Sequence, residues 1–371
     1  MNEKVSIDAS FSVSWTHRLR FSANAFSDGT LHALFQELAP LKVLTVIDGG
    51  VHTNNSVFCD TLHDWISSSE FNHTEPLIVQ GGEEAKNNMQ VVDVVLEALN
   101  SNNLCRRSCV LVVGGGAVLD AVGYATSIAH RGIPIIRMPS TTLAQCDSGI
   151  GVKNAVNYFG KKNFIGVFDP PFAVVNDTRL LTSLDDKHWR SGLSEAVKVA
   201  LVKDADFFRD IESCSEKLVE RDMETMARVI NKSAILHFEH ITNGGDPFER
   251  LDARPLDFGH WSAHKLEQMT GHTLTHGEAV SIGLAIDVRC SVGLGLLDDK
   301  TACRAIALLQ ALGLPTAHCD LLDDVLFEGI EEFRQHLGGQ LTLLMLKGIA
   351  EPIDVHALDA SVVRQAIDEL M

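Results

Sequence analysis

The first half of the chain repeats one pattern that strongly limits its fold. Short apolar runs end in glycine or a small polar residue, and segments with a 3.6-residue apolar period, such as 87–101 and 119–131, lie between several of them. Short buried strands that alternate with helices are typical of a parallel sheet with crossover helices. We therefore predict an α/β, Rossmann-like, nucleotide-binding domain with strands within 41–50, 76–82, 108–116, 133–140 and 172–177.

From about residue 180 the apolar pattern changes to helical spacing almost throughout. The last strand-like run ends just before this point, and the segment LTSLDD (181–186) offers capping residues for a following helix. We predict a domain boundary within 176–185. The Rossmann-like domain is then 1–178, and a mostly α-helical C-terminal domain is 179–371.

Composition narrows the class of protein. The 371 residues include 31 basic and 49 acidic side chains, and a formal charge of −18 disfavours nucleic acid and anionic membranes as partners. Eight scattered cysteines without a CxxC pair indicate reduced thiols. No apolar stretch reaches the roughly 18 residues of a membrane span, and the N-terminal segment lacks the apolar core of a signal peptide. We expect a cytoplasmic protein.

Three consecutive glycines, Gly114 to Gly116, follow an apolar run and precede a helical segment. Such a loop lets backbone N–H groups approach a phosphate, and the helix dipole adds attraction. Glycine turns after strands are also common without a ligand, and this one is not GxGxxG. Two further strand ends favour a dinucleotide. Asp48 follows one apolar run and could accept a hydrogen bond from a ribose hydroxyl, and the segment Gly-Glu-Glu-Ala-Lys (82–86) follows another.

Histidines form a second group of candidates. His260 and His264 are four residues apart on a helical segment and share one face, and His276 follows after a short connection. A metal site needs neutral imidazoles and usually a carboxylate, and three protein ligands leave positions open for substrate oxygens. Glu195, one helical turn from Lys198, can supply the carboxylate. Each histidine alone is more often an ordinary core or surface residue.

A third group is cationic. The segment 147–166 carries Lys153, Lys161, Lys162 and Asn163 among glycines. In isolation a solvated loop with surface lysines explains it. In so acidic a chain, such a cluster is also a plausible site for a small phosphorylated substrate, and Arg131 is a further candidate.

These motifs, taken in order, resemble the sugar-phosphate cyclases, whose best-known member is 3-dehydroquinate synthase. The resemblance extends over nearly the whole chain, and so many ordered motifs make it highly specific. The matching segments are GGE-E-A-K (81–86), GGGAVLDAVGYATS (114–127), RGIPIIRMPSTTLAQCDSGIG-K (131–153), GKKNFIGVFDPP (160–171), SGLSEAVK (191–198), GHWSAH (259–264) and HGEAVSIGL (276–284).

The resemblance implies NAD+ in a cleft between a Rossmann-like and a helical domain, a zinc or cobalt ion, and a homodimer in which Arg131 reaches a neighbouring subunit's phosphate pocket. On matching positions it makes Glu195, His260 and His276 the metal ligands. The remaining roles fall on Asp48, Glu83, Lys86, Gly115, Gly116, Asp120, Ser140, Thr141 and Lys162 for NAD, on Asp147, Lys153, Lys198 and His264 for catalysis, and on Arg131, Asn163 and Asp257 for the substrate.

The chain departs from the dehydroquinate synthase pattern mainly where the substrate would be recognised. Asp257 stands where those enzymes generally carry asparagine, and His237 aligns with an expected lysine. The arginine that holds a substrate carboxylate aligns with Ala253, although Arg254 is adjacent and could serve. The C-terminal Asp-Lys-Lys signature of dehydroquinate synthases is missing, and the segment 332–343 has Arg334, Gln335 and His336 instead.

We therefore expect a carbon–oxygen lyase of the cyclase type that acts on a heptulose phosphate without a carboxylate, such as sedoheptulose 7-phosphate. NAD+ would oxidise a ring hydroxyl, phosphate would leave, NADH would return the hydride, and the ring would open and reclose by an aldol step. Valiolone-forming enzymes of this superfamily are the model for this activity. A genuine 3-dehydroquinate synthase is the alternative within the family. A metal-dependent polyol dehydrogenase and a non-catalytic binding protein are alternatives from other classes.

Overall fold

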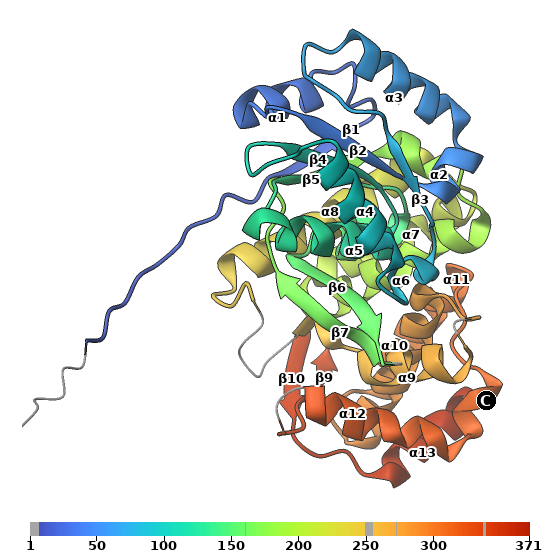
Figure 1. Cartoon of the computed structure of the whole chain (residues 1–371). Helices are drawn as coiled ribbons and strands as arrows, with labels where there is room; N and C mark the ends of the chain where they lie inside the picture. The colour runs from blue at the N-terminus through green and yellow to red at the C-terminus, as the bar shows by residue number, and fades with distance from the viewer. Residues whose placement is uncertain (1–6, 160, 249–254, 272, 337–338) are drawn as a thin grey trace, which may run out of the picture.

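The computed structural model describes residues 7–159, 161–248, 255–271, 273–336 and 339–371. Its N-terminal part is built on a six-stranded parallel sheet with the order β1-β8-β5-β4-β2-β3 (Figure 1). The α/β prediction is confirmed, although the sequence pattern missed the edge strand β1. The strands are β1 (Leu19–Ser22), β2 (Val43–Asp48), β3 (Leu77–Val79), β4 (Cys109–Gly114), β5 (Ile135–Pro139) and β8 (Ala173–Asp177).

Helices cover both faces of this sheet, so its central strands are buried along their whole length. Successive strand residues point to opposite faces. Leu44 packs with α4 (Gln90–Ser101) and α5 (Gly116–Ile128), whereas Val43 packs with α1 (Thr30–Leu38) and α3 (Ser56–Ser68). Burial on two faces explains why these strands read as continuous apolar runs rather than as alternating ones.

The C-terminal part is a cluster of helices around a single apolar core, as the helical spacing predicts. A hairpin of β9 (Leu343–Gly348) and β10 (Glu351–Val355), which we did not predict, packs against it. The helices are α6 (Asp186–Lys203), α7 (Ala205–Val219), α8 (Met223–Asn243), α9 (His260–Met269), α10 (His276–Gly293), α11 (Asp299–Ala311), α12 (Glu328–His336) and α13 (Ala360–Leu370).

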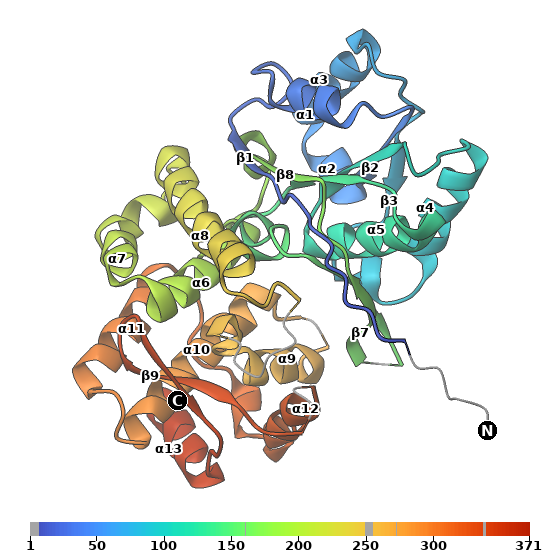
Figure 2. The same cartoon turned by 90° about the vertical axis from the view of Figure 1, so that its left-hand side faces the viewer.

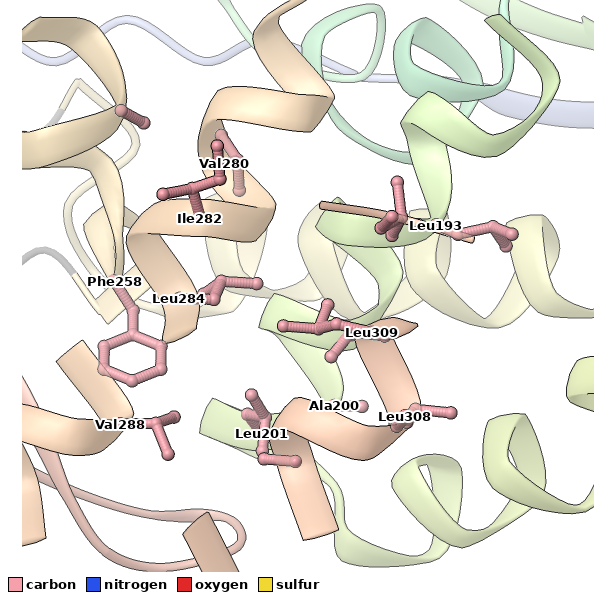
Figure 3. Packing of buried hydrophobic residues seen from close by; sticks show 14 of the residues in the cluster. Leu193, Ala200, Leu201, Phe258, Val280, Ile282, Leu284, Val288, Leu308 and Leu309 are labelled. Atoms are coloured by element: carbon pink, nitrogen blue, oxygen red, sulfur yellow. The ribbon is translucent and has the colours of Figure 1, made fainter. Parts of the chain in front are cut away.

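Two of these helices, α6 and α10, run through the middle of the cluster. Nearly every residue from Trp189 to Val202 in α6 and from Gly277 to Ser291 in α10 is buried, so neither helix has a solvent face. Figure 3 shows side chains of these two helices with Leu308 and Leu309 of α11 in the same apolar cluster. Polar residues on these two helices are therefore held inside the protein. Among the described residues, no helix has the length and apolar character to cross a bilayer.

An antiparallel hairpin, β6 (Lys153–Tyr158) and β7 (Lys161–Phe168), projects from the sheet domain towards the helical cluster (Figures 1 and 2). The sequence pattern indicated only a cationic, glycine-rich segment here. The hairpin places Lys162 beside α9, where it pairs with Glu267.

The sheet reverses its direction of growth at β2. The chain adds β3 on one side of β2 and then returns to place β4 on the other side. Asp48 is the last residue of β2 and Gly114 is the last residue of β4, and these neighbouring strands end at the same edge of the sheet. In open α/β sheets, ligands bind at such a switch point, beyond the carboxyl ends of the strands.

Candidate functional site

Three residues from three helices converge on one point. Oε1 of Glu195 on α6 lies 3.4 Å from Nε2 of His276 and 3.8 Å from Nε2 of His260, and the ligand atoms of all three lie within 4.8 Å of one another. The two histidines are the first residues of α10 and α9. Oε1 of the buried Glu195 accepts no hydrogen bond among the described residues. One buried carboxylate and two imidazoles fit a zinc-like cation with an open position for substrate.

Each imidazole is oriented through its other ring nitrogen. Nδ1 of His276 lies 3.2 Å from Oε2 of Glu267, and Nδ1 of His260 lies 3.1 Å from the carbonyl oxygen of Phe258. These contacts assign the proton to Nδ1 and turn Nε2 towards Glu195. Sequence analysis missed Glu267. It lies seven residues after His260 on α9, and this helical spacing, which places both on one face, could have identified it.

Burial and neighbouring charges set the protonation of the histidines. Burial, together with the charge of Lys198, holds the pKa of His260 well below 6.5, and burial does the same for His264. Burial would also lower the pKa of His276, but the Glu267 carboxylate outweighs it and raises that pKa to about 9. The His264 ring stacks 5.9 Å from the His276 ring, so a neutral imidazole lies beside the triad.

A charged network connects the two parts of the chain beside the triad. Nζ of Lys198 lies 2.5 Å from Oε2 of Glu195 and 3.6 Å from Oδ2 of Asp147, which belongs to the π-helical turn Ala144–Ser148. Oδ1 of Asp147 lies 2.5 Å from Nδ1 of His237 on α8. Burial alone would raise the pKa of Asp147, but Lys198 and His237 hold it well below its usual value. Burial would lower the pKa of Lys198, but the two carboxylates raise it.

The residues that depart from the dehydroquinate synthase pattern have different surroundings. Asp257 ends the turn Pro255–Asp257 ahead of α9, and its charge also raises the pKa of Lys198. Arg334 and Gln335 both bond to Glu331 on their own helix. Two of the positions that bear on a substrate carboxylate, Ala253 and Arg254, lie outside the described residues.

The glycine loop occupies the switch point of the sheet. Gly115 precedes α5 without any side-chain cap, which leaves N–H groups at this helix end for a ligand. The Asp48 carboxylate accepts from the N–H groups of Gly50 at 2.8 Å and Gly115 at 3.3 Å. A Cβ at Gly116 would lie 2.6 Å from Oγ of Ser148, so only glycine fits there without a shift. The loop is thus a tight backbone cradle, which suits a phosphate, and the ribose contact of Asp48 stays a prediction.

Two lysines predicted to bind the cofactor are held by carboxylates. Nζ of Lys86 lies 2.5 Å from Oδ2 of Asp120 on α5, and Lys86 is 4% exposed. Burial would lower the pKa of Lys86, but Asp120 and Glu83 raise it. Nζ of Lys162 on β7 lies 2.7 Å from Oε1 of Glu267 on α9. The second pair joins the sheet domain to the carboxylate that orients a metal-ligand candidate.

The other predicted cofactor residues hold the backbone near the loop. The N–H of Ser140 donates to the carbonyl oxygen of Gly114 at 2.9 Å, and the Thr141 hydroxyl accepts the N–H three residues later at 3.1 Å. Glu83, in the turn after β3, accepts a 3.3 Å hydrogen bond from Asn157 on β6. These contacts bring the ends of β3, β4 and β5 together with the hairpin.

The remaining predicted substrate residues are exposed in the single chain. Lys153 begins β6, and Asn163 lies on β7 with a φ of 54°. Arg131 follows α5 with a φ of 66°. Their predicted roles stay predictions.

Comparison with known families identifies both halves of the chain. The sequence model for the 3-dehydroquinate synthase N-terminal domain matches residues 76–191, and that for the 3-dehydroquinate synthase C-terminal domain matches residues 192–333. Together the two matches cover the glycine loop, the cationic hairpin and all three metal-ligand candidates.

Individual relatives agree with this family and divide between two activities. A 3-dehydroquinate synthase from Halorhodospira halophila is 35% identical over 280 residues, which are 75% of this chain and 78% of the relative. A 2-epi-valiolone synthase from Actinosynnema mirum is 33% identical over 339 residues, 87% of each chain.

A solved structure gives the same result for the fold. The 2-epi-5-epi-valiolone synthase from Streptomyces hygroscopicus subsp. jinggangensis, solved with NAD+ and Zn2+ bound, superposes with a TM-score of 0.89 at 27% identity and covers 99% of both chains. With matching family models across both halves and relatives above 30% identity, the chain belongs to the 3-dehydroquinate synthase family of sugar-phosphate cyclases.

Proposed function

We propose that the chain is a cyclase that converts a heptulose phosphate without a carboxylate, of the sedoheptulose 7-phosphate type, into a carbocycle. Asp257 carries the proposal, because it stands where dehydroquinate synthases generally carry asparagine and its charge acts on Lys198 beside the triad. A substrate carboxylate beside Asp257 would be repelled by its charge, whereas sugar hydroxyls could donate hydrogen bonds to it. The two valiolone synthases that resemble the chain over 87% and 99% of its length support the same substrate class.

The residues present fit the two cofactors that the family implies. Glu195, His260 and His276 would hold Zn2+ or Co2+, and the metal would polarise the hydroxyl that is oxidised. The glycine loop, with Asp48 and the cofactor residues named above, would hold NAD+, which would take up a hydride from the substrate and later return it.

The chain's own side chains supply charge and proton transfer. Lys198 stays cationic between Asp147 and Glu195, so it can stabilise an oxyanion and the leaving phosphate. His264 is neutral beside the triad and can accept or return a proton. Lys153, in the loop after Asp147, would add a second positive charge towards the phosphate.

A homodimer is part of the proposal. Arg131 is exposed at the end of α5 in the single chain, and in a dimer it would reach the phosphate of the neighbouring subunit. Sedimentation should then show that the protein is a dimer. Arg131→Ala should raise KM for the sugar phosphate and leave the dimer intact. A monomeric active enzyme would contradict this part of the proposal.

The substrate is tested by phosphate release from a panel of sugar phosphates, with NAD+ and Zn2+ supplied. We expect sedoheptulose 7-phosphate to be turned over faster than the heptulosonate phosphate that carries a carboxylate. Product mass should equal substrate mass minus phosphoric acid, because the hydride is returned. Faster turnover of the heptulosonate would overturn the substrate assignment in favour of 3-dehydroquinate synthase, the activity of the 35% identical relative.

The same assay separates the cyclase from a polyol dehydrogenase. A dehydrogenase would release NADH as a net product, so absorbance at 340 nm would rise steadily with polyols and NAD+. A cyclase recycles the cofactor and should show phosphate release without that rise. Steady NADH accumulation would overturn the cyclase reading.

A further inference from the structure

The loop between the π-helical turn and β6 connects two residues of the proposed catalytic set. Asp147 belongs to the turn before this loop and Lys153 begins the strand after it, with two glycines between them, Gly149 and Gly151. Residues 149–152 belong to no helix or strand, so their backbone groups must be held by other partners.

A single buried arginine holds most of this loop. Arg137 on β5 is fully buried, and its Nη1 donates to the carbonyl oxygens of Gly151 at 2.8 Å and Gly149 at 3.3 Å. Its Nη2 donates to the carbonyl oxygen of Lys153 at 3.2 Å and to Oδ1 of Asn154 at 2.5 Å. All four acceptors are neutral oxygen atoms, so the guanidinium acts here as a rigid fork of donors.

The same arginine contact extends to the helix that follows the glycine loop. A Cβ at Gly123 on α5 would lie 1.8 Å from Oδ1 of Asn154 and 3.3 Å from Nη2 of Arg137, so α5 packs directly on this pair. Asn154 also donates from Nδ2 to the carbonyl oxygen of Asp169 at 3.1 Å. From the other side, Nε2 of His17 lies 2.8 Å from the carbonyl oxygen of Ile150.

We infer that Arg137 is a positioning residue of the active site: it fixes the loop 147–153 so that Asp147 and Lys153 are held at set positions relative to Lys198 and the glycine-loop helix. The inference rests on the proposed function, which gives those residues their catalytic roles. A shift of about 1 Å in a positioned group is enough to cost on the order of 100-fold in rate. Loss of the three carbonyl contacts removes the side-chain restraint at Gly149, Gly151 and Lys153 and leaves the contact of His17 with Ile150.

The test compares Arg137→Met, which fills similar space without donors, with Arg137→Lys, which keeps the charge but not the fork. Arg18→Met is the control, because Arg18 also donates to backbone carbonyls in the sheet domain, those of Thr16 and Phe172, but to none of those that Arg137 contacts. Asn154→Ala removes one acceptor and keeps the cation, so it remains informative if Arg137→Met does not fold.

Two measurements are made on each variant. Hydrogen exchange of peptides that cover 147–153 should become faster in Arg137→Met, less so in Arg137→Lys and Asn154→Ala, while peptides from α6 keep wild-type protection. Turnover of the sugar phosphate should fall by on the order of 100-fold in kcat for Arg137→Met, with NAD+ affinity and zinc content unchanged. Arg18→Met should match wild type in both.

The outcomes separate this inference from the function it rests on. If wild type turns over no sugar phosphate, the proposed function fails, and exchange of the loop still decides whether Arg137 restrains it. Wild-type exchange in every foldable variant at 137 and 154 would overturn the inference. So would a loosened loop with unchanged kcat, or equal effects from Arg18→Met.

Discussion

The two halves of the site are built in different ways. The metal-ligand candidates and Lys198 lie on α6, α9 and α10, and two of these helices are buried on nearly all sides by apolar neighbours. The cofactor and substrate candidates of the sheet domain lie mainly on loops and a hairpin, where buried polar side chains such as Asp48 and Arg137 hold the backbone.

This difference indicates where the site is rigid and where it can adjust. A side chain on a helix inside an apolar core moves only if the core repacks, which is costly in a close-packed interior. A loop held by a few hydrogen bonds can shift when one donor is lost. Among the described residues, Lys198 and His237 each contact Asp147, and Lys162 contacts Glu267, so the π-helical turn and the hairpin of one half are joined to helices of the other.

Removing a ligand should give the largest effect. In Glu195→Gln the one carboxylate of the triad is lost, and since a bound metal stabilises the transition state by several kcal/mol, turnover should fall by on the order of 10³-fold or more. Metal content by elemental analysis should fall in parallel. Glu212→Gln, at a surface ion pair with Arg304, is the control and should keep metal and activity. A fully active, metal-loaded Glu195→Gln would exclude this residue as a ligand.

The next prediction concerns the carboxylate behind His276. Glu267→Gln keeps the size of the side chain but weakens its hold on Nδ1, and loss of such a partner typically costs 10- to 100-fold in metal affinity, so a decrease of about this size is expected. Competition with a chelating dye would measure it. The exposed neighbour Gln268, changed to alanine, should leave the affinity unchanged. Equal affinities in the two variants would show that Glu267 serves only the pair with Lys162.

The same carboxylate sets a pH dependence. Because Glu267 raises the pKa of His276 to about 9, this ring is protonated at neutral pH without metal, and metal binding must release one proton. Apparent affinity should therefore rise roughly tenfold per pH unit and level off near pH 9. In Glu267→Gln the plateau should begin at a lower pH, nearer the ordinary histidine value. Proton release measured by calorimetry in two buffers would check the sign independently.

A smaller effect is expected in the glycine loop, and it tests the loop half of the comparison. Gly116→Ala brings a Cβ to 2.6 Å from Oγ of Ser148, so the Ser148 hydroxyl or one of the two segments must move. We expect NAD+ binding, measured by fluorescence, to weaken about tenfold while metal affinity stays the same. Gly116→Ala with Ser148→Ala removes the clash and should regain most of the loss. If metal affinity falls as well, a change in the glycine loop alters the metal site, and the sheet half and the helical half are not independent.

Much of the difference between the sheet half and the helical half of the site could be predicted from local sequence patterns. Apolar runs identified β2, β4, β5 and β8, and the i, i+4 spacing of His260 and His264 placed both on one face of α9, where their rings lie 5.4 Å apart. Glu195 could be chosen only by chemical type and by the resemblance. Glu195 contacts histidines that lie 65 and 81 residues further along the chain, and a local sequence pattern cannot predict contacts between residues so far apart.

Two of the missed features, Arg137 and the hairpin, have different physical causes. Arg137 lies in an apolar strand and acts on backbone carbonyls 12 to 16 residues away, so its role depends on how the loop folds over the sheet. The hairpin β6–β7 was hidden by its charged and glycine residues, which read as a loop. The role of Arg137 is a tertiary arrangement, which local propensity does not encode, whereas the hairpin is a local structure of two successive strands.

The smallest effect is expected at the start of α10, and it tests the rigidity of the helical half directly. Thr275 and Glu278 form a capping box, in which the Thr275 side chain accepts the N–H of Glu278 and the Glu278 carboxylate accepts the N–H of Thr275 at 2.8 Å. Thr275→Ala should cost about 1 kcal/mol of unfolding free energy in a urea titration, and Thr275→Ser should cost little. Because the core and Glu267 hold His276 independently of the cap, metal affinity should not change in either variant. A clear loss of metal affinity in Thr275→Ala would mean that the first turn of α10 is as adjustable as the loops of the sheet domain.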